Sequence, residues 1–174
     1  TDGTGAVSIL SYQPSCDYPN NFIPYVLQTL STIAVNDGLG NVSTIRYDYV
    51  GGYYDRVERE YRGFNQVIQT NSDQTTVDRN YWVDKQFLKS KIFLVQTRDP
   101  AANLMVQSYY EWTTANLGPA EFVKLILEQT LYYDGPDDYV GWRIDYTYDD
   151  ANGNLLWKVR SGTDAEEVTS TYAY

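Results

Sequence analysis

Asp37-Gly-Leu-Gly40-Asn41 separates an apolar run from a stretch of alternating polar and aromatic residues. A related line returns as Asp99-Pro-Ala-Ala-Asn103, and again, one residue longer, in Tyr146-Thr-Tyr148-Asp149-Asp-Ala-Asn-Gly153-Asn154-Leu155. Thr171-Tyr-Ala-Tyr174 resembles the start of the same line. Because internal repetition decides architecture, these lines predict a chain built from strand–turn–strand units.

The repeated lines have the chemistry of turns. Gly supplies a positive φ, and Asp and Asn bond to nearby backbone and tolerate left-handed conformations. A calcium loop at Asp149–Asn154 is the alternative. Aligning Gly153 with the glycine of an EF-hand puts Tyr148 at the first ligand position and Val159 at the last, where carboxylates are needed. The turn is therefore favoured, and we expect no metal and no cofactor.

The composition favours β-structure and excludes several functions. The chain has 18 Tyr, 4 Trp and no His among 174 residues, and aromatic residues suit a half-exposed pleated surface. The net charge of -10 argues against nucleic acid and anionic membranes as partners, and no membrane span is found. Without His, Ser–His and Cys–His catalysis is excluded, and the single Cys16 cannot form an internal disulfide. We expect a protein that is not an enzyme.

The order of elements predicts an all-β, mostly antiparallel, repeat-built sheet preceded by an irregular segment over residues 1–24, where Gly and Pro recur. Residues 25–174 are expected to form the sheet. The expected strands are Tyr25–Val35, Val42–Tyr49, Tyr53–Gln69 after a bend at Gly51-Gly52, Thr76–Val83, Lys91–Arg98, Leu104–Trp112, Phe122–Tyr133, Tyr139–Tyr148 and Leu155–Arg160.

One of these segments is ambiguous. Pro119 and the apolar spacing over residues 119–131 would also suit a short helix. We favour a strand that pairs with Tyr139–Tyr148 across a turn at Asp134–Asp138, and a meander that continues through Leu155–Arg160.

The segment Glu58-Arg59-Glu60-Tyr-Arg62-Gly63-Phe64 concentrates charge. If it is a strand, Glu58 and Glu60 share one face, as a carboxylate pair for acid–base catalysis would. The neighbouring Arg59 and Arg62 favour a structural network of ion pairs instead. Gly63 would allow a close backbone approach or a bulge.

The same segment carries a family resemblance. Tyr47–Phe64 resembles a segment of the B component of insecticidal toxin complexes and of Salmonella virulence plasmid B-type proteins, in which an aromatic strand and Gly-x-Tyr/Phe-Asp precede Glu-Arg-Glu-Phe-Arg-Gly-Phe. Tyr146–Leu155 is similar to a YD repeat of the Rhs type, and the likeness runs from about Tyr25 to the C-terminus. Tyr61 and Asn65 depart from the usual Phe and Gly, and the Asp99 line lacks the turn Gly.

The resemblance implies a scaffold rather than a reaction centre. In that family such repeats wind into a β-sheet spiral that closes as a hollow shell around a toxic polypeptide. The implied partners are the rest of the toxin chain, other toxin-complex subunits and the enclosed polypeptide, with a secreted or cell-surface location. The expected exposed strand edges also predict self-association.

A different class of function stays open as the alternative. Flat aromatic rings stack on sugars, so a cell-surface adhesin or glycan-binding module would use the four tryptophans, Trp82, Trp112, Trp142 and Trp157. Packing within the sheet is the more ordinary use of such rings, and we favour it.

Overall fold

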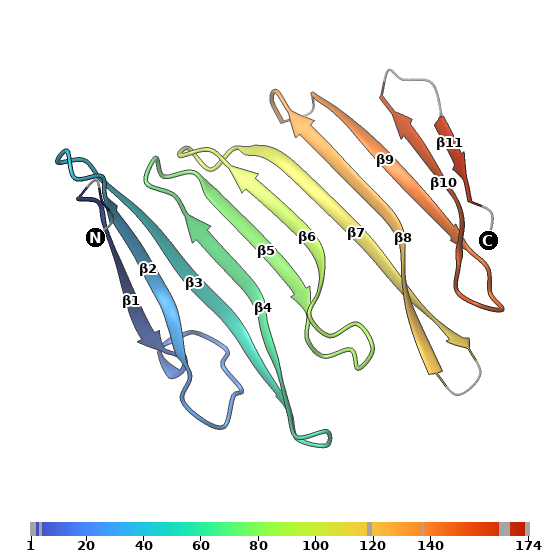
Figure 1. Ribbon diagram of the computed structural model, residues 1–174, viewed down its shortest axis with the longest axis horizontal. Helices are drawn as coiled ribbons and strands as arrows, with labels where there is room; N and C mark the ends of the chain where they lie inside the picture. The colour runs from blue at the N-terminus through green and yellow to red at the C-terminus, as the bar shows by residue number, and fades with distance from the viewer. Residues whose placement is uncertain (1–2, 4, 118–119, 137, 164–167, 173–174) are drawn as a thin grey trace.

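The computed structural model describes the chain except for residues 1–2, 4, 118–119, 137, 164–167 and 173–174. Eleven strands form one sheet in which each strand pairs with its neighbours in the sequence, in the order β1 to β11 (Figure 1). All pairs are antiparallel. The elements are β1 (Val7–Pro14), the 3-10 helix η1 (Ser15–Asp17), β2 (Gln28–Asn36), β3 (Val42–Asp55), β4 (Glu60–Thr70), β5 (Thr76–Trp82), β6 (Lys91–Arg98), β7 (Leu104–Leu117), β8 (Ala120–Tyr133), β9 (Tyr139–Tyr148), β10 (Leu155–Gly162) and β11 (Val168–Thr171).

The all-β, antiparallel prediction is confirmed. β6 and β9 have the predicted bounds. The segment that could have been a helix is strand β8, which pairs along its length with β7 and, from Leu127 to Tyr133, with β9. The fragment at Thr171 is the end of β11, while Ala173 and Tyr174 lie outside the described residues.

Two expectations about segments are wrong. Residues 1–24 are not irregular throughout, because Val7–Pro14 form β1 and pair with β2. The expected strand Tyr53–Gln69 is interrupted: β3 runs through Gly51 and Gly52 to Asp55, and a turn over residues 56–59 precedes β4. The first error arises because β1 is an edge strand with mixed polar and apolar residues. The second arises because the turn contains neither Gly nor Pro.

The two glycines have a packing role that the sequence did not reveal. The loop between η1 and β2 lies against β3, where Phe22 donates its N–H to the Gly52 carbonyl at 2.7 Å and Gly51 donates to the Pro19 carbonyl at 3.3 Å. A Cβ at Gly52 would lie 2.7 Å from Ile23 Cδ1 and closer still to Asn21 Oδ1. Gly52 therefore leaves room for the Asn21 and Ile23 side chains of the loop to pack against the strand.

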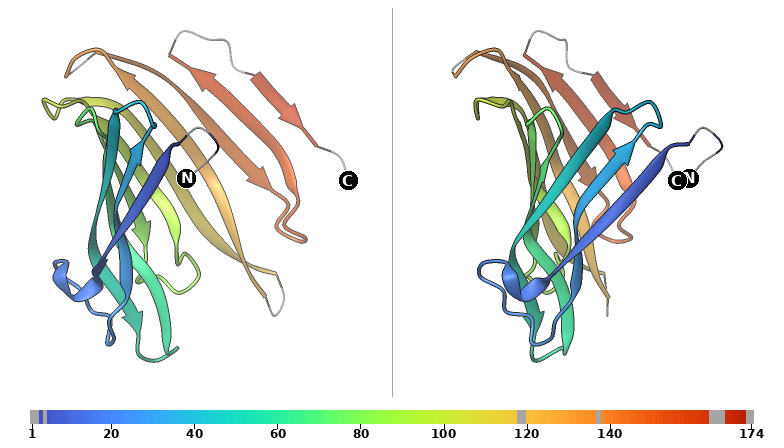
Figure 2. Two further views of the ribbon diagram at one scale, coloured as in Figure 1. Left: turned by 60° about the vertical axis from the view of Figure 1, so that its left-hand side comes forward. Right: turned by 90° about the vertical axis from the view of Figure 1, so that its left-hand side faces the viewer.

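The sheet is a single layer, twisted and curved so that its edge strands leave the plane of the central strands (Figure 2). Few described apolar side chains are buried: Tyr18, Phe64, Val83, Leu88 and Leu127. Among the described residues no helix could span a bilayer. The total accessible surface is 10907 Å², against about 8,700 Å² expected for a compact monomer of this mass. The excess reflects the missing second layer.

Candidate functional site: the Arg62 hairpin and the rim turns

The hairpin between β3 and β4 is closed by Asp55. Its carboxylate Oδ1 accepts hydrogen bonds from the backbone N–H of Val57 at 2.8 Å and of Glu58 at 3.0 Å. Arg59 takes the left-handed conformation at φ 54°. The Asp55 side chain thus stabilises a turn that contains neither Gly nor Pro. The sequence analysis did not identify Asp55 as part of this site.

Glu58 and Glu60 do not form a carboxylate pair, which was the alternative to the favoured network of ion pairs. Glu58 lies exposed in the turn, whereas Glu60 is the first residue of β4. The expectation that the two share a strand face is therefore wrong. Arg59 also lies exposed in the turn, and no ion pair involving Glu58 or Arg59 is found in the described part of the chain.

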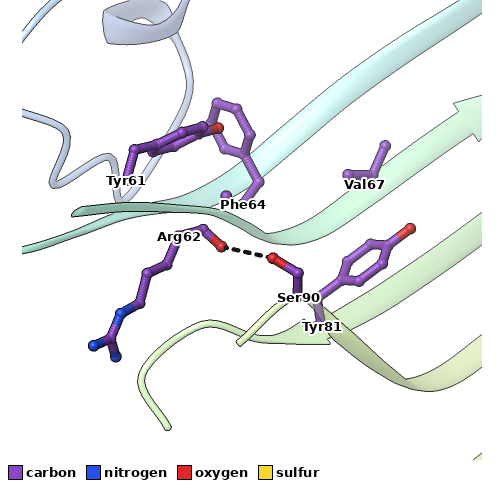
Figure 3. A pocket seen from close by; sticks show the side chains of 7 residues that line it. Tyr61, Arg62, Phe64, Val67, Tyr81 and Ser90 are labelled. Atoms are coloured by element: carbon purple, nitrogen blue, oxygen red, sulfur yellow. Dashed lines mark hydrogen bonds between the residues drawn. The ribbon is translucent and has the colours of Figure 1, made fainter. Parts of the chain in front are cut away.

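Arg62 is the centre of this hairpin. Tyr53 pairs with Gly63 and Tyr54 pairs with Tyr61, so Arg62 is the extra residue of a bulge, and the φ of 95° at Gly63 is typical of one. Nothing lies within 4 Å of a Cβ built on Gly63, which favours the bulge over a close backbone approach. The bulge buries the Arg62 side chain, leaving 2% exposed, and the guanidinium points away from the Tyr61 ring (Figure 3).

Ion pairs fix the Arg62 guanidinium. Its Nη2 lies 2.7 Å from Asp55 Oδ2, and its Nε lies 3.7 Å from Glu60 Oε2. Lys89, from the loop between β5 and β6, lies 2.6 Å from the same Glu60 oxygen. Arg62 Nε has no hydrogen-bond partner within the described residues. The cluster joins two hairpins through shared charge.

Electrostatics keep the Asp55 carboxylate ionised. The N–H of Glu58 lowers the pKa of Asp55 below its usual value, and Val57, Arg62 and Lys89 act in the same direction. Burial raises the pKa of the nearby Tyr61 to about 12, so its phenol stays protonated. A fixed anion and a neutral phenol suit structural cohesion rather than proton transfer at neutral pH.

Phe64 anchors the aromatic side of the same region. Its ring centroid lies 4.8 Å from that of Tyr49 and 6.2 Å from those of Tyr18 and Tyr61. Tyr18 comes from the loop after η1, and its hydroxyl accepts a 3.2 Å hydrogen bond from Thr29 Oγ1. These rings form the largest described aromatic cluster and tie the N-terminal loop to β3 and β4.

Two of the repeated lines form the same turn. Asp37 Oδ1 accepts from the N–H of Leu39 at 2.7 Å and of Asn41 at 3.1 Å, and Asn41 Nδ2 donates to Asp37 Oδ2 at 2.6 Å. The bonds from Ala101, Asn103 and Asn103 Nδ2 to Asp99 are equivalent, at 2.8–2.9 Å. Ala102 takes the place of Gly40, at φ 67° against 98°. The Asn side chain lowers the pKa of each Asp, so both carboxylates are ionised.

A further turn of this kind was not recognised in the sequence. Asn71 N–H donates to the Thr75 carbonyl at 2.9 Å, its Nδ2 donates to Thr75 Oγ1 at 2.9 Å, and Gln74 has φ 68°. Asn and Thr replace the usual Asp and Asn. These turns follow β2, β4 and β6 and therefore lie along one rim of the sheet (Figure 1).

The Asp149–Asn154 turn lies on the opposite rim, between β9 and β10. Asp149 Oδ1 accepts from Ala151 N–H at 2.7 Å, and Gly153 donates to the Asp149 carbonyl at 2.8 Å. The preceding tyrosines reach back to β8: Tyr146 donates to Glu128 at 3.0 Å and Tyr148 donates to the Leu125 carbonyl at 3.0 Å. Mainly through burial, the pKa of Tyr146 rises to about 12.

The tryptophans are mostly engaged with their neighbours. Trp82 stacks on Phe93 with centroids 4.5 Å apart, Trp112 donates its indole N–H to the Ile92 carbonyl at 2.7 Å, and Trp142 lies 5.5 Å from the Arg160 guanidinium. Trp157 is the one tryptophan in the exposed class, at 41%. Within the described residues, no group of three or more His, Cys, Asp or Glu side chains could hold a metal ion.

The N-terminal half of this chain matches a known protein family. The family model described as the insecticide toxin TcdB middle/N-terminal region matches residues 1–94. No curated protein matches the chain. Since the family match covers more than half of the 174 residues, the chain belongs to this toxin family. The resemblance noted at Tyr47–Phe64 is thereby confirmed, and the family match also includes residues 1–24.

Solved structures share the fold at low identity. A crystal structure of TcdB2-TccC3 superposes with a TM-score of 0.82 and 15% identity, over 92% of this chain and 12% of that one. A Photorhabdus luminescens Tc holotoxin pore superposes with a TM-score of 0.78 and 15% identity, over 92% and 11%. The chain therefore spans about an eighth of the length of the chains whose fold it shares.

Proposed function

We propose that this chain is a wall segment of a β-sheet shell that encloses a toxic polypeptide within a toxin complex. The observation that carries the proposal is the single-layer sheet, whose eleven strands follow one another in chain order. A second layer or a closed barrel would make a self-contained domain. A one-layer meander suits a wall that continues into further strands.

Both faces of the sheet mix polar and apolar side chains, which supports the proposed role as a shell wall. One row across β3 to β7 reads Asp48, Ile68, Asp78, Gln96 and Gln107, and the row beside it on the other face reads Tyr49, Val67, Arg79, Val95 and Ser108. Polar neighbours satisfy one another, as in the 2.7 Å bonds from Gln66 to Asp78 and from Gln96 to Gln107. Neither row is the continuous aliphatic surface that would require a covering layer.

The role is non-enzymatic in this proposal. The charged side chains around Arg62 form ion pairs within the β3–β4 hairpin and with Lys89 of the next hairpin. The Asp carboxylates of the rim turns accept hydrogen bonds from backbone N–H groups of their own turns. The partners are the rest of the toxin chain, other toxin-complex subunits and the enclosed polypeptide, and the location is secreted or at the cell surface. The similar solved structures belong to toxin complexes, which supports these assignments.

Protease protection in the assembled toxin complex tests the proposal. Thr130 lies in central strand β8, is 7% exposed and is flanked by β7 and β9. Thr130→Pro removes a ladder hydrogen bond and opens the wall. We expect the enclosed polypeptide to resist protease in the native complex and in Glu58→Gln, and to be digested in assembled Thr130→Pro. Equal digestion of the polypeptide in the native complex and in Thr130→Pro would exclude a wall role.

A further inference from the structure

Asn152-Gly153 is the only Asn-Gly pair in the sequence, and it lies in the turn between β9 and β10. Asparagine before glycine is the pair most prone to spontaneous deamidation, because glycine has no side chain to shield its backbone nitrogen. Asn152 is exposed, so water reaches its side-chain amide. The reactivity of the pair is therefore set by the hydrogen bonds of the turn.

Each group that would react is engaged in one of those hydrogen bonds. The N–H of Gly153, whose nitrogen would be the nucleophile, donates to the Asp149 carbonyl at 2.8 Å. Asn152 Nδ2, the leaving group, donates to Asp149 Oδ2 at 2.8 Å. Asn152 Oδ1 accepts from the N–H of Asn154 at 2.8 Å. The closed turn thus holds the nucleophile and the side chain it would attack in separate bonds.

Deamidation begins when the Gly153 nitrogen loses its proton to hydroxide. The nitrogen then attacks Asn152 Cγ, the Cγ–Nδ2 bond breaks, and Nδ2 leaves as ammonia with a proton taken from water. Water opens the resulting succinimide to aspartate or isoaspartate. A backbone amide that donates to a carbonyl is not deprotonated until that bond opens, as in amide hydrogen exchange. The N–H of Asn154 polarises the Cγ carbonyl, but this assists attack only after the nitrogen has lost its proton.

We infer that Asn152 is a deamidation site that is closed in the folded chain and reacts when the β9–β10 turn opens. The product weakens the turn that protected it. Aspartate has an oxygen where Nδ2 now donates, so it loses the bond to Asp149 and places two carboxylates side by side. Isoaspartate lengthens the backbone by one atom, so the bond from Gly153 to the Asp149 carbonyl loses its present geometry.

Peptide mapping of the full-length toxin polypeptide tests the inference. Trypsin cleaves after Arg143 and Lys158, so one peptide contains both Asn152 and Asn154, and fragment ions distinguish them. Asn154 is the internal control, because Leu155 follows it and shields the attacking nitrogen. We expect Asn152 to deamidate at least about tenfold more slowly in the folded polypeptide than in guanidinium chloride at the same pH and temperature. A folded rate equal to or above the denatured rate would overturn the inference.

Two variants separate the turn from the local charge. Asp149→Ala removes the acceptor of the Nδ2 bond, so the ratio of denatured to folded rate should fall at least about fivefold. Asp150→Ala removes an adjacent carboxylate that is 89% exposed and pairs with Lys124, so it should keep the native ratio. Equal ratios in the two variants would contradict the protective role of the turn.

Amide hydrogen exchange tests the same opening in the native polypeptide, and it decides the matter even if Asp149→Ala fails to fold. The Gly153 amide must exchange through the opening that allows deamidation. Its protection factor should therefore equal the ratio of denatured to folded deamidation rates within about threefold. A protected Gly153 amide beside an Asn152 that deamidates at its denatured rate would refute the inference.

Discussion

At the scale of single residues, steric exclusion and buried charge explain why particular side chains stand where they do. Gly52 is required because the N-terminal loop leaves no room for a methyl group, and Arg62 is required because two carboxylates converge on its bulge. Gly52 and Arg62 each act at one position outside the repeated turns, so a single substitution tests each role.

Gly52→Ala is expected to lower the free energy of unfolding by about 1–3 kcal/mol, because the new Cβ would overlap Asn21 and Ile23. Urea denaturation measures the change. A Cβ added at Gly3 would meet nothing within 4 Å, so Gly3→Ala is the matched control and should change stability by less than about 0.5 kcal/mol. Equal effects of the two substitutions would show that the loop does not constrain Gly52.

Arg62→Ala and Lys89→Ala compare two cations that share Glu60. Arg62 is 2% exposed and Lys89 is 44% exposed. Removing the buried cation leaves Asp55 without its ion-pair partner and opens a gap in the packing, while Glu60 keeps Lys89, so the expected cost is about 3 kcal/mol. Removing the exposed one should cost less than about 1 kcal/mol. Thermal unfolding measures both, and a reversed order would contradict the structure.

At the scale of elements, the rim turns show how different sequences reach one geometry. The chemistry of Asp37–Asn41 identified the turn correctly, and the Asp99 turn has the same hydrogen bonds although it lacks Gly. The left-handed conformation is costly for an L residue such as Ala102, and it is retained because the surrounding bonds fix the turn.

Exchanging the residues at this position should have opposite effects. Ala102→Gly relieves the left-handed strain and is expected to raise stability by about 0.5–1 kcal/mol after the entropy of the unfolded Gly is subtracted. Gly40→Ala introduces the same strain and should lower stability by a similar amount. Denaturation of both variants measures the difference, and a shared sign would refute the equivalence of the turns.

The turn carboxylates also predict an acid dependence. Side-chain bonds from Asn41, Thr75 and Asn103 lower the pKa of Asp37, Asp73 and Asp99 below the ordinary 3.8. The ionised forms therefore stabilise the fold above that pH, and this stability is lost as pH falls through the lowered values. Asp→Asn at all three positions should flatten the loss of stability measured between about pH 4 and 2. If the triple variant lost stability with falling pH as steeply as the native chain, the three carboxylates would not be the cause of the acid dependence.

Sequence reasoning succeeded where pattern and turn chemistry agree, as for β6 and β9 and for the turns at Asp37, Asp99 and Asp149. It failed where the decisive contact is distant in the sequence. Residues 56–59 contain no Gly or Pro that would predict the turn stabilised by Asp55. Strand β1 forms because it pairs with β2, a contact that its own sequence does not indicate.

At the scale of the whole molecule, the sheet ends in two edge strands, β1 and β11. Ile9 and Leu10 of β1 are 60% and 52% exposed, and such an edge pairs readily with another chain. We expect the chain to self-associate with rising concentration in light-scattering measurements. Ile9→Lys/Leu10→Lys should suppress association, whereas Leu39→Lys at a hairpin tip should not. A native chain that stays monomeric at all concentrations would disprove this expectation.

The strictly sequential order of the strands has a consequence for folding and for size. Each strand finds its partners within the adjacent stretch of chain, so contact order is low and pairing can propagate from hairpin to hairpin as in a one-dimensional array. Such an array loses cooperativity along its length, and either end can fray while the other persists. The sheet can also gain or lose a whole hairpin without a change in the topology of the other strands. Two antiparallel strands leave the chain running in its original direction, so the strand that follows keeps its orientation.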